Sequence, residues 1–240
     1  MKIALIGYGK MGKTIEKLAL EKKDEIVVKI DDTTLDQFTE ENLKKADVAI
    51  EFSTPEVAFN NISKCINSGI PVVSGTTGWL NRFGEIEQLC KQKNGGFFYA
   101  SNYSLGVNIF FKVNEYLAQI MNNFPEFDIA IEETHHIHKL DAPSGTAITI
   151  AEGILKNLVR KTAWEKELTD SSSKIAVKSH RIGEHPGEHV VKYNSPIETI
   201  EILHTSKSRE GLAMGALMAA RYMQNKVGIF GMDDLLNISK

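Results

Sequence analysis

The chain has 240 residues, of which 42% are hydrophobic, and its formal net charge is -3 at pH 7. This length and composition allow one large or two modest globular domains with buried cores. Because acidic and basic residues are interspersed and nearly balanced, we expect neither nucleic acid nor a membrane as a partner. The apolar runs have the length of strands, no secretory leader is recognisable, and Cys65 and Cys90 lie far apart in predicted helices as reduced thiols, so we expect a cytoplasmic protein.

The first predicted element is a strand from Ile3 that enters a glycine-rich loop and then a helix with apolar residues at helical spacing. A G-x-G-x-x-G run between a strand and a helix is typical of dinucleotide binding. The first glycine permits the turn, the second lets the backbone approach a pyrophosphate, and the third allows close helix packing, while the helix N-terminus favours the anion. We therefore predict cofactor contacts at Gly7, Tyr8, Gly9, Lys10, Met11 and Gly12.

The second predicted strand, Glu25 to Ile30, is followed by Asp31, about twenty residues beyond the glycines. An acid at this place accepts hydrogen bonds from the adenosine ribose hydroxyls, which favours NADH. Lys10 and Lys13 lie beside the loop and suit the 2′-phosphate of NADPH. Asp31 joins the predicted cofactor site, and NADH and NADPH both remain open as cofactors.

Strands and helices then alternate, with strands predicted over 47–52, 70–74 and 96–100 and helices over 55–68 and 80–93. Near-continuous apolar strands in this alternation predict a Rossmann-like parallel sheet with helices on both faces. Polar residues follow the strand ends, at the edge where such sheets bind ligands. These strand-end residues are Phe52, Ser53, Gly75, Thr76, Thr77, Ser101, Asn102 and Tyr103.

The second half of the chain predicts a smaller α+β domain with a mixed or mainly antiparallel sheet. Helices are expected over 107–121 and 144–159, an alternating strand over 127–133, and three further alternating segments over 174–181, 188–193 and 198–205, with a polar connection at 169–173. A last helix, over 209–223, is apolar nearly all round and must be buried within a domain or between subunits.

The segment 133–147 concentrates the chemistry of the chain, because it combines three imidazoles, an ammonium and a helix start. Imidazole titrates near neutral pH and donates protons, and the ammonium of Lys139 attracts an anion. Ser144 caps the helix that follows, which leaves the amides of Gly145 and Thr146 to face a small anion at the helix N-terminus. The segment therefore predicts a site for a carboxylate or a phosphate.

This segment resembles, position by position, the signature Glu-x-His-His-x-x-Lys-x-Asp-Ala-Pro-Ser-Gly-Thr-Ala of the dihydrodipicolinate reductase family, now usually called 4-hydroxy-tetrahydrodipicolinate reductase. The resemblance implies NAD(P)H-dependent reduction of 4-hydroxy-tetrahydrodipicolinate (dihydrodipicolinate) to tetrahydrodipicolinate in the diaminopimelate and lysine biosynthesis pathway. It also implies that the strand-end residues listed above line the nicotinamide and ribose. The substrate is then a small cyclic dicarboxylate.

The family likeness further implies a domain layout, an assembly and roles. Residues 1–104, completed by 210–240, form the dinucleotide-binding domain, and 105–209 form the substrate-binding and oligomerisation domain of a homotetramer. His135 is the expected proton donor, with Lys139 as second acid or as the charge that stabilises the developing electron density. His136, Lys139, Gly145 and Thr146 hold a substrate carboxylate, and Asp141 orients the loop. We expect no metal, because the histidines at 135, 136 and 138 lack identifiable cysteine or carboxylate partners.

Two other functions remain open from sequence. One is another two-domain NAD(P)-dependent amino-acid dehydrogenase, of the aspartate or homoserine type, which shares the glycine loop but leaves the 133–147 match unexplained. The other is a nonenzymatic NAD(P)-sensing regulator, which typically loses proton donors that are present here. Arg181 and His185 belong to a pattern similar to one in the family, in which either residue approaches the substrate, although Pro186-Gly187 also suits a plain hairpin turn. This chain has a shorter glycine loop than many family members.

Overall fold

The computed structural model describes residues 1–167, 171–208 and 210–237. The chain divides into two compact units. Unit 1 comprises Met1–Ser104 and Glu210–Lys240, and unit 2 comprises Leu105–Arg209. Two residues of the predicted polar connection, 169 and 170, lie outside the described residues.

Unit 1 is built on a six-stranded sheet in the order β11-β5-β4-β3-β1-β2, and every neighbouring pair is parallel. Parallel strands covered on both faces lack the polar alternation of half-exposed strands, and β3 and β4 are accordingly buried throughout. The strands are β1 (Lys2–Ile6), β2 (Glu25–Ile30), β3 (Val48–Glu51), β4 (Val72–Ser74), β5 (Gly96–Tyr99) and β11 (Gly228–Phe230).

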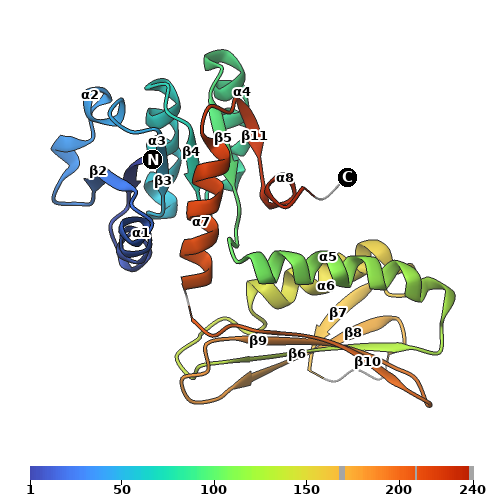
Figure 1. Cartoon of the computed structure of the whole chain (residues 1–240). Helices are drawn as coiled ribbons and strands as arrows, with labels where there is room; N and C mark the ends of the chain where they lie inside the picture. The colour runs from blue at the N-terminus through green and yellow to red at the C-terminus, as the bar shows by residue number, and fades with distance from the viewer. Residues whose placement is uncertain (168–170, 209, 238–240) are drawn as a thin grey trace. The chain divides into compact units, whose positions relative to one another are not determined.

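Helices cover both faces of this sheet (Figure 1). On one face α3 and α4 bury Ile62, Cys65 and Ile86 against the strands. On the other face α7 packs on α1 and on β3 to β5, so this strongly apolar helix is buried within unit 1. The helices are α1 (Lys10–Glu21), α2 (Glu40–Leu43), α3 (Pro55–Asn67), α4 (Phe83–Lys93), α7 (Glu210–Met223) and α8 (Met232–Leu235), with short 3-10 turns η1 (Leu35–Gln37) and η2 (Leu80–Arg82).

Unit 2 holds a five-stranded mixed sheet in the order β10-β9-β6-β8-β7. The β10/β9 and β9/β6 pairs are antiparallel, whereas β6/β8 and β7/β8 are parallel. Helices α5 and α6 lie on one face of the sheet (Figure 1) and bury Ile131, Ile150 and Val191 there. The elements are α5 (Leu105–Ile120), η3 (Met121–Asn123), β6 (Asp128–His135), α6 (Gly145–Asn157), β7 (Ala163–Lys166), β8 (Lys174–Arg181), β9 (Glu188–Asn194) and β10 (Thr199–Thr205).

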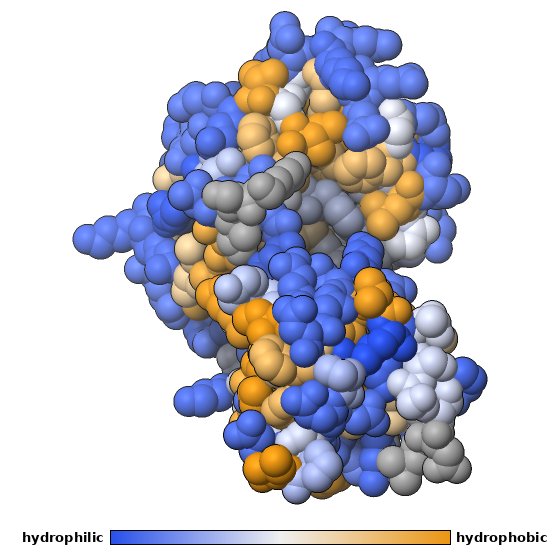
Figure 2. Space-filling view, turned by 90° about the vertical axis from the view of Figure 1, so that its right-hand side faces the viewer, coloured by the Kyte–Doolittle hydropathy of each residue, from blue (hydrophilic) through white to orange (hydrophobic). Residues whose placement is uncertain are grey.

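The predicted fold class is confirmed, because a parallel Rossmann-like sheet is followed by a mixed sheet with its own helices. The structure adds the short strands β7 and β11 and the short helices α2 and α8, which the sequence pattern does not indicate. Cys65 and Cys90 are buried free thiols, as expected. Among the described residues, no helix has the length and apolar character needed to cross a bilayer. On the face drawn in Figure 2, hydrophilic residues border patches of hydrophobic ones in both units.

Candidate active site

The glycine loop of unit 1 joins β1 to α1, and its three glycines differ in their surroundings. Gly7 has φ +93, and a Cβ there would lie 2.0 Å from the Phe52 carbonyl oxygen. A Cβ on Gly12 would lie 2.5 Å from the Gly7 carbonyl oxygen, so the start of α1 sits directly on the loop. Gly9 caps α1 and faces open space, since no atom lies within 4 Å of a Cβ built on it. The loop thus leaves a backbone surface open at a helix N-terminus, where anions are favoured.

Asp31, which follows β2 directly, forms hydrogen bonds with the polar groups of the next turn. Its Oδ1 accepts hydrogen bonds from the Thr33 amide at 2.9 Å and from the Thr33 hydroxyl at 2.7 Å. These bonds lower the pKa of Asp31, so it is a carboxylate at neutral pH. The neighbouring Tyr8 ring lies beneath the Lys29 ammonium, 5.1 Å from the ring centroid, and the Tyr8 hydroxyl donates to Glu16.

A cavity of about 270 Å³ opens at the carboxyl ends of β3 and β4. The strand-end residues predicted from sequence supply most of its walls. It is lined by Met11, Phe52, Ser53, Pro55, Gly75, Thr76 and Thr77. Gly75 lets the Phe52 ring lie directly over the backbone, because a Cβ there would stand 2.1 Å from the ring and displace it. The cavity therefore lies on the edge of a parallel sheet where small ligands bind.

Glu51, at the end of β3, is fully buried under this cavity. Its carboxylate accepts hydrogen bonds from the hydroxyls of Ser53, Ser74 and Thr76, and also from the Ser53 amide. Burial raises the pKa of Glu51, and the hydrogen bonds oppose that rise. The sequence analysis does not single out Glu51. Its position could have indicated it, because an acid at the end of a buried apolar strand must have hydrogen-bond partners.

The loop after β5 places the other predicted cofactor residues. Ser101 is exposed, and the Asn102 side chain accepts a hydrogen bond from the Ser104 amide at 2.9 Å. The Tyr103 ring is buried, and its hydroxyl donates to the Ser74 carbonyl at 2.6 Å. A Cβ on Gly215 of α7 would lie 1.8 Å from the Tyr103 carbonyl oxygen, so α7 closely supports this loop from within unit 1.

In unit 2, His135 is the last residue of β6 and is mostly buried, with a relative exposure of 9%. Its Nδ1 lies 3.3 Å from Oε2 of Glu133, which is fully buried. Oε1 of Glu133 accepts hydrogen bonds from the Ser144 amide at 3.0 Å, the Ser179 hydroxyl at 2.7 Å and the Arg181 guanidinium at 3.2 Å. Burial alone would raise the pKa of Glu133, but His135, Ser144 and Ser179 outweigh it and hold the pKa well below its usual value.

The loop after β6 carries Lys139, whose ammonium lies 2.8 Å from the Asp141 carboxylate. Burial opposes ionisation of Asp141, but the Lys139 ammonium outweighs it and lowers the pKa of Asp141. Arg181 donates to the carbonyl oxygens of Lys139 and Asp141 at 3.2 and 2.5 Å, so it holds this loop in place. His138 is exposed and pairs at 3.1 Å with the exposed Glu184.

Helix α6 begins directly after this loop. Ser144 is its N-cap and accepts a hydrogen bond from the Ala147 amide at 3.2 Å. The amides of Gly145 and Thr146 lie in the first turn, where no preceding helical carbonyl can accept from them. A Cβ built on Gly145 would meet no atom within 4 Å, so the helix N-terminus is open to a small anion.

His189, on β9, is a buried member of this cluster that sequence reasoning does not assign. Its ring lies 5.1 Å from the His135 ring, and its Nε2 lies 3.7 Å from Glu133 Oε2. Burial, and next the charge of His135, lower the pKa of His189 to about 3, so it is neutral at physiological pH. The nearest ligand atoms of Glu133, His135 and His189 all lie within 4.8 Å of one another, a set that differs from the three histidines weighed in the sequence.

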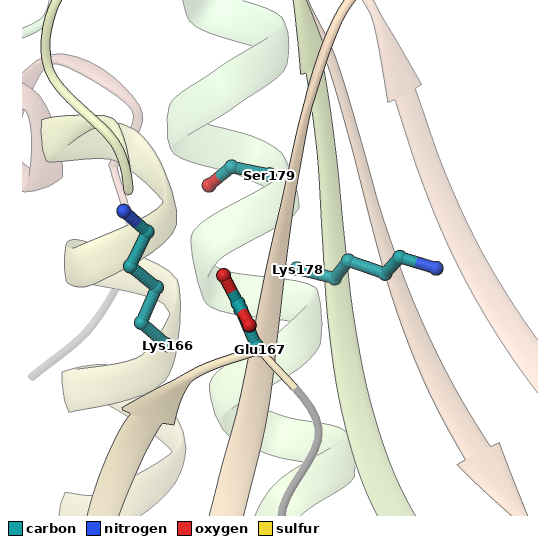
Figure 3. A pocket seen from close by; sticks show the side chains of 4 residues that line it. All are labelled: Lys166, Glu167, Lys178 and Ser179. Carbon is teal, nitrogen blue, oxygen red and sulfur yellow. The ribbon is translucent and has the colours of Figure 1, made fainter.

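A second cavity, of about 310 Å³, is lined by Lys166, Glu167, Lys178 and Ser179. Figure 3 shows the side chains of Lys166, Glu167 and Ser179 on one side of β8 and that of Lys178 extending on the other. Ser179 links the cavity wall to Glu133 through its hydroxyl.

Comparison with known proteins agrees with this geometry. The model of the dihydrodipicolinate reductase N-terminus matches residues 1–103, and that of the C-terminus matches residues 106–236. A protein of Christiangramia forsetii called 4-hydroxy-tetrahydrodipicolinate reductase is 46% identical over 237 residues, covering 99% of this chain and 98% of the relative. One of that name from Archaeoglobus fulgidus is 33% identical over 265 residues, covering 98% and 100%.

Solved structures agree on the fold. A dipicolinate-bound dihydrodipicolinate reductase from Paenisporosarcina sp. TG-14 aligns with a TM-score of 0.80 at 22% identity, covering 98% of both chains. An amine dehydrogenase from Mycobacterium smegmatis aligns with a TM-score of 0.60 at 11% identity, covering 95% of this chain and 94% of the other. Both family models and two full-length relatives above 30% identity lead to one conclusion: this chain belongs to the dihydrodipicolinate reductase family.

Proposed function

We propose that this enzyme reduces 4-hydroxy-tetrahydrodipicolinate, or the dihydrodipicolinate formed from it by loss of water, to tetrahydrodipicolinate with NADH or NADPH. The reaction belongs to diaminopimelate and lysine biosynthesis. The observation that carries the proposal is the arrangement of His135 and Lys139 beside the open N-terminus of α6, in a chain that both family models match.

Unit 1 is the dinucleotide-binding domain in this proposal. Gly9 offers backbone with open space above it, and the α1 N-terminus favours the pyrophosphate. The cavity lined by Phe52, Gly75 and Thr77 has the size and position for a nicotinamide. When bound, the nicotinamide supplies the hydride. Glu51 keeps the strand-end hydroxyls of this cavity in fixed positions from below.

Unit 2 is the substrate domain in this proposal. A dicarboxylate needs a cation and hydrogen-bond donors. We assign these roles to the Lys139 ammonium, the His136 imidazole and the amides of Gly145 and Thr146. Thr146 adds its hydroxyl. Asp141 pairs with Lys139 and keeps the ammonium in place, which is a loop-orienting role rather than a contact with the dianion.

The proton is supplied by this chain. In the dihydrodipicolinate ring, from which the 4-hydroxyl has already left as water, hydride addition at C4 moves electrons toward the ring nitrogen as an enamine. The neighbouring carbon must then receive a proton. We assign the donation to His135, with Lys139 as the second acid or as the charge that stabilises the developing electron density.

The choice between NADH and NADPH depends on groups around the β2 end. Asp31 is ionised and already accepts hydrogen bonds from Thr33, and as a carboxylate it favours ribose hydroxyls over a 2′-phosphate. Lys10 and Lys13 act in the opposite direction. We propose that both cofactors are used.

The two other functions lose their support. An aspartate- or homoserine-type dehydrogenase would not account for both family models or for the full-length relatives. A nonenzymatic sensor would not need a histidine held by a buried carboxylate and an ammonium held by Asp141. From the family resemblance we also propose a cytoplasmic homotetramer that assembles through unit 2.

The test is the loss of nicotinamide absorbance when the fresh product of dihydrodipicolinate synthase is added with NADH or with NADPH. We expect rapid oxidation that stops when the substrate is exhausted. If the protein binds dinucleotide but oxidises neither cofactor, the reductase proposal is wrong, and a nonenzymatic NAD(P)-sensing regulator becomes the favoured function.

A further inference from the structure

Glu133, near the end of β6, forms more contacts than a residue that only takes part in the strand. It is completely buried on β6, and its Oε1 is occupied by Ser144, Ser179 and Arg181. Among the residues that the structure describes, its Oε2 faces two imidazoles, His135 at 3.3 Å and His189 at 3.7 Å. A fully desolvated carboxylate with one oxygen directed at two histidines must affect how those rings are protonated.

The contact between Glu133 and His135 joins two buried atoms, Oε2 of the carboxylate and Nδ1 of the imidazole. Oε2 of Glu133 and Nδ1 of His135 are both buried, and neither forms a hydrogen bond with another group in the described part of the chain. Buried polar atoms of this kind are normally satisfied, so a proton on Nδ1 that points to Oε2 is the arrangement that satisfies both. Because its pKa is held low, Glu133 remains a carboxylate that can only accept, so the proton of this contact belongs to the imidazole.

The opposite edge of the His135 ring carries Nε2, the other nitrogen that can donate a proton. Its Nε2 lies against Gly187, where a Cβ would stand only 3.2 Å from Nε2. Glycine therefore keeps this atom free of a neighbouring methyl group. His189 does not compete for the proton, since burial and the charge of His135 lower its pKa to about 3.

We propose that Glu133 is a positioning residue that holds the Nδ1 proton of His135, so that Nε2 is the atom that donates to substrate. This inference rests on the proposed function. In the step, the Nε2–H bond of the imidazolium breaks and a C–H bond forms at the ring carbon next to C4, while the enamine electron pair supplies that bond. His135 is left neutral with its remaining proton on Nδ1, facing Glu133, and solvent restores the proton on Nε2.

The first readout does not require activity. Protein labelled with 15N-histidine is examined by long-range 1H–15N spectra at a pH where His135 is neutral, with the signals assigned by a His135→Gln variant. We expect the neutral ring to carry its proton on Nδ1 in the wild type, and Glu133→Gln to lose this preference because its amide donates as well as accepts.

The second readout is kinetic. Glu133→Gln should lower kcat about a hundredfold, within the range that a positioned proton donor contributes, and leave the KM for NAD(P)H within a factor of about two. Glu184→Gln is the matched control, because Glu184 pairs with His138 at 3.1 Å but both side chains are exposed. That variant should keep wild-type kcat. Thermal melting and dinucleotide binding, a property assigned to unit 1, show whether Glu133→Gln is folded.

The results distinguish a failure of the positioning role of Glu133 from a failure of the proposed function. A wild-type His135 protonated on Nε2, or a folded Glu133→Gln variant with kcat within twofold of wild type, overturns the positioning role. Loss of wild-type activity on chelation also overturns it, because Glu133, His135 and His189 would then act as metal ligands. An inactive wild type that still shows the Nδ1 tautomer contradicts the proposed function and leaves the positioning of His135 intact.

Discussion

Lys139 is the cation that most directly joins the candidate site to an anionic substrate. Its ammonium is held by Asp141, and its side chain is only 23% exposed, so water screens its charge incompletely. The contribution of a charge-assisted hydrogen bond in such a place is about 2 kcal/mol, which corresponds to roughly thirtyfold in a rate or binding constant.

The Lys139→Ala variant should therefore lose about thirtyfold in kcat/KM for the dicarboxylate, at the level expected for one charge-assisted contact. The control is Lys178→Ala, because Lys178 is an exposed lysine on β8. Steady-state assays of both variants give the comparison. Equal activity of Lys139→Ala and Lys178→Ala would remove Lys139 from the mechanism.

Glu51 gives a prediction about pH and stability. Burial raises its pKa in the folded chain above the unfolded value. The protonated Glu51 side chain therefore contributes fully to the stability of the fold below the pKa that Glu51 has in the unfolded chain. This contribution is lost as pH rises through the pKa that Glu51 has in the folded chain. Glu51→Gln does not titrate, so its melting temperature minus that of the wild type should increase from about pH 4 to about pH 7. Glu87→Gln, at an exposed acid of α4, is the control, and an equally flat difference for both variants would contradict the assignment.

At the scale of elements, the strand–loop–helix unit of β1 and α1 separates two roles of glycine. Gly9 has φ -81, a conformation open to any residue, and no atom near its Cβ position. Gly12 is in contact with the Gly7 carbonyl oxygen. Gly9 therefore leaves space for a ligand, whereas Gly12 allows α1 to pack against the loop.

Two alanine variants test this difference. Gly9→Ala should keep the wild-type melting temperature but bind NAD(P)H more weakly, because its methyl group occupies the approach to the loop. Gly12→Ala should be destabilised by about 1–3 kcal/mol, because α1 must move away from the loop. Calorimetry and dinucleotide titration measure the two effects, and unchanged dinucleotide affinity in Gly9→Ala would place the pyrophosphate elsewhere.

Elements with a clear hydrophobic period are predictable from the sequence. The bounds of β2 and β8 agree with the expected 25–30 and 174–181, because continuous or alternating apolar residues define them. β7 and β11 have only four and three residues at sheet edges, too few for any period to be visible. Their pairing is decided by tertiary contacts.

Some residues of the candidate site are likewise predictable from the local sequence, and others are not. The 133–147 signature and the strand ends are local, so the sequence alone is enough to predict them as candidate site residues. Glu51 and His189 are not identified, because their roles come from partners far along the chain. Ser74 and Thr76 lie 23 and 25 residues from Glu51. His189 meets Ser144 across 45 residues, a contact that only the pairing of β9 with β6 creates.

For the whole molecule, unit 2 presents an edge strand with exposed apolar side chains. β10 ends the sheet, and Leu203 on it is 59% exposed. An edge of this kind is normally paired or covered, which agrees with the proposed assembly through unit 2.

Leu203→Lys should therefore break the proposed homotetramer, whereas Val159→Lys should not, although Val159 is 87% exposed in the same unit. Sedimentation velocity at several protein concentrations distinguishes the species. A wild type that sediments as a monomer, or a Leu203→Lys variant that stays tetrameric, would show that β10 is not the contact.

In the proposed reaction, the enzyme transfers a hydride from a reduced nicotinamide to C4 of the cyclic substrate. The most direct measurement follows the label: NAD(P)H deuterated at either face of nicotinamide C4 is oxidised with fresh substrate, and the product is examined by mass spectrometry and NMR. We predict that one of the two labelled cofactors places one deuterium at ring C4 for each nicotinamide oxidised. Oxidation that leaves the ring unlabelled with both cofactors would contradict the account.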